Sequence, residues 1–360
     1  MSNPPLPDPE QSVTSHQSPV AASGAPSTVL DSPFTIHHSP FTSFDSRPRL
    51  IIIQGPTGTG KSDLALRLAR QCNGEIVGAD SLQIYRGMEI GSAAPGPELL
   101  AQIPHHLIGI LEPDQPFTAA DYEREASEAI TGILKRGRVP FVVGGTGLYI
   151  RALLGGIIEA PSANEELRRE LTERARREGS EALLAELATV DPESAARLYP
   201  NDQVRIIRAL EIYRITGIPF SRLTREHGFR EARYTVLKIG LTRERSQLYR
   251  RVEERVEAMI SAGLLEEVNG LIIQGYSPQL KSMGAIGYKE ICRHLAGEIS
   301  LYEAIELIKR NTRHYVKRQL TWFFRDSATK WFEYPENFVS IQKLVGEFIA
   351  SSPYSGEIQH

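Results

Sequence analysis

The sequence predicts an α/β fold in which a parallel β-sheet is flanked by helices and carries an all-helical insertion. Near the start of the folded region, a short apolar run is followed by a glycine-rich loop and a stretch of good helix formers. The same order of apolar run, turn and helix recurs further along the chain. A charged stretch with a purely helical period then precedes another apolar run. Repeated strand–helix units predict a parallel sheet with helices on both faces.

The overall composition is that of an ordinary globular protein. Of its 360 residues, 41% are apolar and 24% are charged, and the formal net charge is −3. No apolar run approaches the roughly 18 residues that a membrane-spanning helix needs. The two cysteines, Cys72 and Cys292, lack the spacing of a disulfide framework or a zinc site. We therefore expect a cytoplasmic protein without membrane contact, in which any binding of nucleic acid depends on a local basic cluster.

The glycine-rich loop matches the phosphate-binding loop of P-loop NTPases. Residues 55–62 read G-x-x-x-x-G-K-S, and the preceding run Leu50–Ile53 fits a buried parallel strand. Helix formers follow the loop, so backbone N–H groups at the start of that helix would point at a bound phosphate. The alternative is a glycine-rich turn without a ligand, but such a turn rarely lies between a buried strand and a helix. We therefore predict a phosphate or nucleotide site made by Gly55, Pro56, Thr57, Gly58, Thr59, Gly60, Lys61 and Ser62.

Other apolar runs and amphipathic stretches predict the remaining elements. Short runs rich in β-branched residues predict strands, and apolar residues spaced three or four apart predict helices. The predicted strands are 50–53, 75–79, 139–143 and 234–241. Besides the helix after the loop, the predicted helices are 121–136, 164–188, 202–216, 245–262 and 300–321.

The chain divides into a tail, a core, an insertion and an extension. Residues 1–46 are rich in Ser, Pro and Thr and contain no Lys or Arg, so we expect a disordered tail that is no targeting signal. Residues 47–157 and 231–331 form the predicted α/β core, and residues 158–230 form the helical insertion. Residues 332–360 are weakly patterned, and we treat them as a C-terminal extension without assigned structure.

Three polar residues follow three different predicted strands. Lys61 comes after the first strand, Asp80 directly after the second and Thr146 after the third. Parallel α/β sheets bind ligands beyond the carboxyl ends of their strands, so we expect these side chains to meet at one edge. Asp80 would there hold a metal, act as a general base, or merely cap a turn. Its position alone does not decide between these roles.

Two further motifs have structural alternatives. The second glycine turn, Gly144–Tyr149, is either part of the same site or a turn whose glycines serve tight packing. His105 and His106 would point to opposite faces of a strand, so a shared metal ion is disfavoured and we expect a structural role.

The last predicted helix combines basic and aromatic residues. Lys309, Arg313 and Lys317 are four residues apart and share one helical face, with aromatic residues between them. This pattern suits an RNA backbone with stacked unpaired bases, whereas a solvated face above core aromatics gives the same pattern. We favour RNA binding because other predicted helices and loops contribute further basic residues, namely Arg205, Arg208, Lys281 and Lys289.

Seven blocks of the sequence occur in an order typical of one family. They are Gly55–Ser62, Asp80–Met88, Pro104–Leu107, Val142–Tyr149, Arg205–Glu211, Gly284–Lys289 and Thr312–Phe323. Through these blocks, which span residues 48–328, the chain resembles the tRNA dimethylallyltransferases, also called tRNA isopentenyltransferases. The phosphate loop alone is unspecific, whereas the second and last blocks are specific. No Cys/His zinc finger follows the core, which favours the bacterial type.

The resemblance implies a definite reaction. Such enzymes transfer a dimethylallyl group from dimethylallyl diphosphate to N6 of the adenosine directly 3′ of the anticodon, position 37, in tRNAs that read codons beginning with U. The loop would then hold the diphosphate of the donor, with Mg²⁺ on Ser62. The tRNA anticodon stem-loop would be the binding partner, gripped by the helical insertion, and the protein would act as a monomer.

The resemblance also implies roles for individual residues. Asp80 would be the general base toward the adenine amine, Thr57 would bond the bridging oxygen of the donor, and Arg245 would contact the diphosphate. Phe324 stands where arginine is frequent in the family, but this departure touches neither Asp80 nor Lys61. The implied tRNA contacts fall on Asp80, Ser81, Leu82, Gln83, Thr146, Arg168, Gln203, Val204, Arg205, Ile206, Ile207, Gly284, Ala285, Ile286, Gly287, Tyr288, Lys289, Lys317, Arg318 and Gln319.

Two other functions share part of these features. A P-loop nucleotide or small-molecule kinase would have the loop, the sheet and a lid-like insertion, but it would transfer phosphate from ATP. A non-catalytic RNA-binding protein could retain the loop and would show no turnover.

Overall fold

A six-stranded parallel sheet lies at the centre of residues 47–228 and 232–351, the part of the chain that this computed structural model describes. Its spatial order is β3-β2-β4-β1-β5-β6. All four predicted strands are confirmed, and the predicted tail 1–46 lies outside the described residues. The strands are β1 (Arg49–Gln54), β2 (Gly74–Gly78), β3 (His105–His106), β4 (Val139–Gly144), β5 (Thr235–Thr242) and β6 (Lys330–Glu333).

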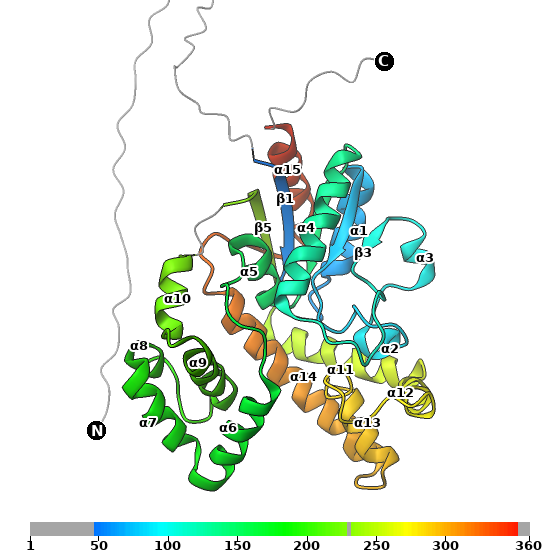
Figure 1. Ribbon diagram of the computed structural model, residues 1–360. Coiled ribbons are helices and arrows are strands. Elements are labelled where there is room, and N and C mark those ends of the chain that lie inside the picture. Colours follow the sequence, from blue (N-terminus) through cyan, green and yellow to red (C-terminus); the bar gives the residue numbers. More distant parts are fainter. Residues whose placement is uncertain (1–46, 229–231, 352–360) are drawn as a thin grey trace, which may run out of the picture. The chain divides into compact units, whose positions relative to one another are not determined.

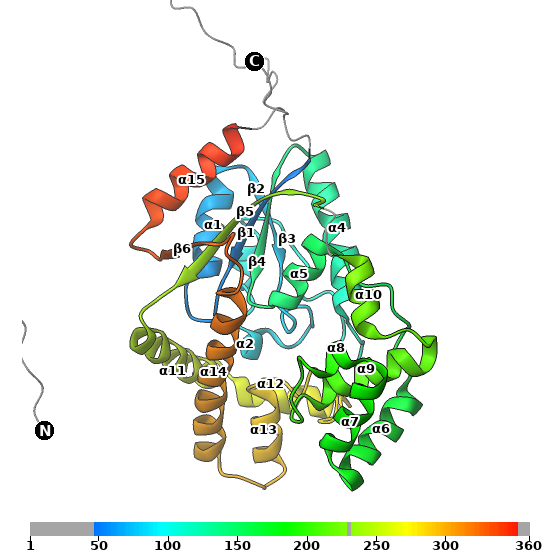
Figure 2. The same cartoon turned by 90° about the vertical axis from the view of Figure 1, so that its left-hand side faces the viewer.

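Apolar side chains cover both faces of the sheet. Alternate residues of β1 enter two separate clusters, Leu50 and Ile52 on one side and Ile51 and Ile53 on the other. Figure 2 shows the helices that complete these two layers. α4 (Ala119–Lys135) and α5 (Gly147–Gly155) pack on the first face, and α1 (Lys61–Gln71) and α15 (Phe338–Ala350) on the second. Both faces are therefore buried, as the continuous apolar runs predict.

A group of helices lies beyond the carboxyl ends of the strands (Figure 1). The two longest, α11 (Arg245–Ser261) and α14 (Leu301–Phe323), run in opposite directions, because Leu248 and Val252 near the start of α11 pack on Val316 of α14. The shorter helices of this group are α2 (Glu89–Ser92), α12 (Leu264–Ile273) and α13 (Tyr288–Leu295). α3 (Pro97–Leu100) lies instead beside β3 (Figure 1), and its Leu99 packs against the apolar cluster of α1. Within the described residues, no helix is long and apolar enough to cross a membrane.

The basic face expected on the last helix is partly a helix–helix contact. Lys309 forms ion pairs with Glu257 at 2.6 Å and with Glu306 at 2.9 Å, and Arg313 pairs with Glu253. These two side chains therefore bind α14 to α11. Their contact with RNA stays a prediction, and the ion pairs add a structural role that the sequence period did not indicate, because a period shows which residues share a face but not what covers it.

The helical insertion has a core of its own. Among the residues that the structure describes between α5 and β5, five helices occur, and Leu171, Leu187 and Leu210 belong to the apolar cluster inside them. The buried carboxylate of Glu211 binds Arg168 through two hydrogen bonds of 2.9 and 3.0 Å. The helices are α6 (Glu165–Glu178), α7 (Ser180–Val190), α8 (Pro192–Ala195), α9 (Gln203–Thr216) and α10 (Phe220–His227).

The end of the chain contains structure that the sequence analysis left unassigned. β6 pairs with β5 along four residues, and α15 buries Ile341 and Val345 in the cluster of α1. The described part of 332–360 therefore belongs to the α/β core rather than to a separate extension. The sequence pattern of this strand was weak, because β6 is a short edge strand whose side chains are half-buried or exposed.

A buried carboxylate links three elements at the opposite end of the sheet. Glu75 on β2 accepts hydrogen bonds from Arg136 Nε at 2.9 Å and Nη2 at 2.6 Å, and its other partners are Arg138 at 3.2 Å and His106 at 2.6 Å. The Arg136 hydrogen bonds lower the pKa of Glu75 to about 2, against burial, which acts in the other direction. This position of His106 agrees with the structural role expected for the histidine pair.

We expect replacement of Glu75 by Gln to lower the free energy of unfolding by about 2–3 kcal/mol at pH 7, because the charge-assisted bonds are lost in a buried setting. The folded pKa lies below its ordinary value near 4.5, so the ionised group stabilises the fold above that pH. Urea unfolding of the original protein and of the Glu75→Gln variant measures the difference in their free energies of unfolding. The difference should shrink as the pH falls from 5 toward 3, and a constant difference would contradict the assignment.

Candidate active site

The carboxyl ends of β1, β2 and β4 meet at one edge of the sheet, as the sequence predicted. Lys61 and Asp80 line one cavity of about 440 Å³, whereas the predicted third residue, Thr146, does not line it, although its neighbour Gly145 does. α11, α14 and the segment 284–289 supply the rest of its lining. Segments from distant parts of the sequence thus share one cavity, and the phosphate loop is one of them.

The phosphate loop has the backbone conformation that its glycines allow. Gly60 directly precedes α1 with φ 92°, a left-handed conformation that favours glycine, and a Cβ there would lie 2.8 Å from the ring of Tyr334. The Thr59 hydroxyl and the Lys61 Nζ both donate to the carbonyl of Pro56, at 2.8 and 2.7 Å. No side chain of the described residues caps α1, so the N–H groups of its first turn are available to an anion.

Two cations lie side by side at the phosphate loop. Arg255 of α11 donates from Nη1 to the Thr57 hydroxyl at 3.1 Å and from Nη2 to the Ser92 carbonyl at 3.3 Å. Burial, and next the Arg255 charge, lower the pKa of Lys61 from 10.5 to about 7, while Asp80 acts in the opposite direction. Burial also lowers the pKa of Arg255. Such paired cations favour a ligand with more than one negative charge.

The lowered pKa of Lys61 predicts proton uptake when an anion binds. Above pH 7 the free amine is largely neutral, and a bound diphosphate would favour its charged form. We expect uptake near one proton at pH 8 and near zero at pH 6. Calorimetry of diphosphate binding in buffers with different ionisation enthalpies measures this number. Lys61→Arg should show no uptake at either pH, and equal uptake in both proteins would refute the assignment to Lys61.

Asp80 lies in the turn after β2 and also lines the cavity. Its Oδ1 accepts a hydrogen bond from the Leu82 N–H at 2.9 Å, which is the capping role considered above. The backbone N–H of Ser81, the residue between Asp80 and Leu82, donates to the Thr146 hydroxyl at 3.1 Å. The turns after β2 and β4 are therefore joined, and Asp80 is held at the cavity wall while it caps its own turn.

Gln319 connects the phosphate loop to the turn after β4. It is buried, with 5% of its surface exposed. Its Oε1 accepts from the Thr57 N–H at 3.0 Å, and its Nε2 donates to the Gly145 carbonyl at 2.9 Å. The sequence analysis placed a tRNA contact here, whereas the structure places a clamp that fixes two loops of the site.

The cavity also has an apolar part, which begins at the phosphate loop, because a Cβ on Gly58 would lie 3.3 Å from Val252 Cγ2. Val252, Val256 and Met259 follow one another along α11, and Ile308 of α14 and Ile286 complete this part. The α11 residues advance by about 10 Å along the helix axis, since each residue adds 1.5 Å. A cationic end next to an apolar end suits an amphiphilic ligand, with an anionic group and a small hydrocarbon.

The remaining predicted tRNA contacts divide into exposed and buried residues. Ile206, Ile207 and Tyr288 are buried in the helical cores, so their side chains cannot lie on an RNA-binding surface. On α9, the exposed neighbours are Val204, with 83% of its surface exposed, and Arg205. The exposed members near the cavity are Ser81, Gly284, Lys289, Lys317 and Arg318. An RNA in contact with these segments would therefore meet the exposed residues on α9 and near the cavity, and not the buried ones.

The structure does not bring Arg245 to the cavity. It is exposed at the start of α11, where its Nε donates to the Tyr249 hydroxyl at 3.0 Å. Arg255 lies in the cavity instead, and the sequence analysis missed it. A signal was present, because the period of 3.6 places Arg255 on the same face as the apolar residues Leu248, Val252 and Met259. A charged residue inside an apolar stripe predicts a buried partner or ligand.

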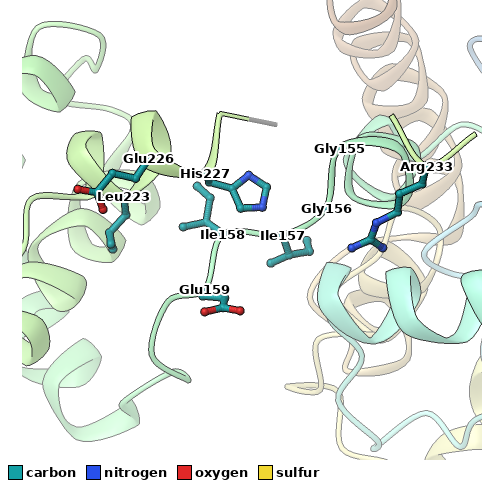
Figure 3. A pocket seen from close by; sticks show the side chains of 9 residues that line it. All are labelled: Gly155, Gly156, Ile157, Ile158, Glu159, Leu223, Glu226, His227 and Arg233. Carbon is teal, nitrogen blue, oxygen red and sulfur yellow. The ribbon is translucent and has the colours of Figure 1, made fainter. Parts of the chain in front are cut away.

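A second cavity, of about 470 Å³, lies where the insertion joins the core (Figure 3). The segment 155–159 and residues of α10 line it, together with Arg233. Two of the lining residues, Glu159 and Glu226, are carboxylates, which would repel a diphosphate, and Arg233 is already paired with Glu123. The first cavity is therefore the better candidate for an anionic ligand.

Comparisons with known proteins agree with one another. The family model "IPP transferase" matches residues 83–326, and the model "isopentenyl transferase" matches residues 48–106. The tRNA dimethylallyltransferase 2 of Geotalea uraniireducens is 59% identical over 306 residues, which are 85% of this chain and 99% of that protein. The tRNA dimethylallyltransferase of Geobacter sulfurreducens is 57% identical, over 84% of this chain and 97% of that protein.

Solved structures give the same result. The full-length tRNA isopentenylpyrophosphate transferase of Bacillus halodurans is similar with a TM-score of 0.63 and 39% identity, covering 85% of this chain and 98% of that one. A eukaryotic dimethylallyltransferase acting on tRNA is similar with a TM-score of 0.73 and 28% identity, over 86% and 81% of the two chains.

Proposed function

The chain belongs to the tRNA dimethylallyltransferase family, prenyltransferases that modify tRNA. We propose that it binds dimethylallyl diphosphate in the cavity of about 440 Å³ and transfers the dimethylallyl group to N6 of adenosine 37. The adjacency of Lys61 and Arg255 to an apolar wall is the observation that carries this proposal. A nucleoside triphosphate needs no such wall, whereas an allylic diphosphate presents both an anion and a branched hydrocarbon. Acceptor tRNAs that read codons beginning with U are part of the proposal.

The leaving group of the reaction is the diphosphate, and its charge grows as the C1–O bond breaks. Lys61, Arg255 and the N–H groups at the start of α1 would stabilise that charge in place before the reaction begins. The Thr57 hydroxyl, which accepts from Arg255 at 3.1 Å, is suitably located to donate to the bridging oxygen. Gln319 would keep Thr57 in position through the Thr57 N–H.

We propose that Mg²⁺ assists the same step. Mg²⁺ retains several waters and commonly binds through substrate phosphates and few protein oxygens. The Ser62 hydroxyl, which lines the cavity next to Lys61, fits this requirement as a single protein ligand. When bound, the ion would neutralise part of the charge on the diphosphate.

Asp80 would accept the proton that the adenine amine loses. It lines the same cavity as the phosphate loop and the exposed residues Ser81, Lys289 and Arg318, and its charge acts on Lys61. The target base must leave its stack to reach this cavity, and an unpaired base of an anticodon loop does so at a small cost. Basic residues around the opening would hold the flanking phosphates.

A kinase is the alternative function, and one assay separates the two. The protein should convert an adenosine of an anticodon stem-loop to its isopentenyl form with dimethylallyl diphosphate and Mg²⁺, without ATP. ATP consumption without a modified adenosine would support the kinase instead. We further propose a monomer acting in the cytoplasm, and light scattering of the protein with and without the stem-loop tests the monomer.

A further inference from the structure

One aromatic side chain lines the candidate active site. Of the residues that line this cavity in the described chain, only Tyr315 of α14 carries an aromatic ring. Tyr315 lies one helical turn before Gln319 and about two turns after Ile308, between the loop clamp and the apolar end of the wall. The ring is therefore placed where the anionic and hydrocarbon parts of a donor would meet.

The Tyr315 ring lies near a cation of the protein itself. Burial and next the charge of Asp80 raise the pKa of its hydroxyl, whereas the neighbouring side chains of Gln319 and Thr146 act in the opposite direction. The guanidinium carbon of Arg318, another residue of the cavity lining, lies 5.6 Å from the centre of the ring. A cation within about 6 Å of a ring centre is attracted by its electron-rich face.

The reaction places positive charge near this position. As the C1–O bond of an allylic diphosphate breaks, its electron pair leaves with the diphosphate, and positive charge spreads over C1 and C3 of the hydrocarbon. The amine lone pair of adenine then forms the N6–C1 bond, and the proton of N6 goes to Asp80. Of the described groups, Lys61 and Arg255 stabilise the anion, but they repel the hydrocarbon cation.

We propose that the ring of Tyr315 stabilises the allylic cation that develops during prenyl transfer. This inference rests on the proposed function of the cavity. It gives Tyr315 a catalytic role, because the ring would contact the reacting hydrocarbon. Gln319 would act as a positioning residue, since it lies one helical turn from Tyr315 and its own hydrogen bonds join the helix to two loops of the site. The same Gln319 also fixes the phosphate loop, so one side chain sets the distance between ring and leaving group.

The test is a series of phenylalanine analogues at position 315 with zero, one, two and three ring fluorines. Fluorine withdraws electrons from the ring face but changes its size little. We expect the single-turnover rate of prenyl transfer to fall stepwise by about 3- to 30-fold in total, with a linear relation between the logarithm of the rate and the cation affinity of the ring. The dissociation constants of donor and stem-loop should stay within about twofold. Tyr315→Leu should be slower than the phenylalanine variant.

Tyr302 provides a matched control, because it lies on the same helix, is exposed and does not line the cavity. The same fluorinated series at Tyr302 should leave the rate unchanged. A flat series at position 315, combined with a slow Tyr315→Leu variant, would show that the ring only fills space and would overturn the proposal. Lys61→Ala and Asp80→Asn are measured in parallel, because unchanged rates in these two would instead refute the site itself.

Discussion

Replacement of Asp80 by Asn is expected to slow prenyl transfer by about 10²- to 10⁴-fold, the usual contribution of a general base. Asn keeps an oxygen that can accept the Leu82 N–H, so the turn after β2 should persist. It cannot take a proton from N6. Donor and tRNA dissociation constants should therefore change by no more than about threefold. Rapid-quench measurements with saturating enzyme give the rate of the chemical step.

Asp80→Ala is the matched variant that separates the base from the cap. It loses both functions, so it should be as slow as Asp80→Asn and less stable, by the ~1 kcal/mol typical of a lost capping bond. If Asp80 were only a cap, Asp80→Asn would be nearly as fast as the unmodified protein, and only the Ala variant would be impaired. A non-catalytic RNA-binding protein would show no turnover in any form.

Replacement of Arg255 by Gln is expected to lower the single-turnover rate by about 10²- to 10³-fold, the loss found when one donor to a developing anion is removed. Its guanidinium contacts Thr57 in the cavity, whereas Arg245 lies outside the cavity. Arg245→Gln is measured in the same assay. It shows whether Arg245, as the resemblance implies, or Arg255, as the structure indicates, contacts the diphosphate. A large effect of Arg245 with a small effect of Arg255 would refute the structural assignment.

The Arg255 variant has a second readout through Lys61. The positive charge of Arg255 contributes to the lowered pKa of Lys61, so its removal should raise that pKa. Proton uptake on diphosphate binding at pH 8 should then decrease, because more of the free amine is already charged. A merely structural effect of the substitution would leave the uptake unchanged.

The strands and the common edge of the site were predictable because local pattern and topology determine them. Leu50–Ile53 has the apolar run of a buried parallel strand, and residues after parallel strands share one edge. β6 was missed because an edge strand buries little, and its place depends on pairing with β5 rather than on its own pattern. Local sequence does not contain that pairing.

Individual site residues were harder to predict than the site's location. Gln319 and Ile206 lie in blocks that resemble family motifs, yet the structure buries both, one as a clamp and one in the helical core. A block identifies a segment, and only packing decides which of its side chains reach a ligand. Arg255 was missed for the opposite reason, because its significance depends on Thr57, which is 198 residues away in the chain.

The central claim is that the phosphate loop holds the diphosphate of a prenyl donor next to a tRNA base. The most direct measurement is position-resolved mass spectrometry of an anticodon stem-loop incubated with this protein, dimethylallyl diphosphate and Mg²⁺, without ATP. We expect a gain of one C₅H₈ unit on the adenosine directly 3′ of the anticodon, and no gain when that adenosine is replaced by guanosine. An unmodified stem-loop, or a C₅H₈ gain at any other nucleotide, would show that the phosphate loop does not hold a prenyl donor next to this base.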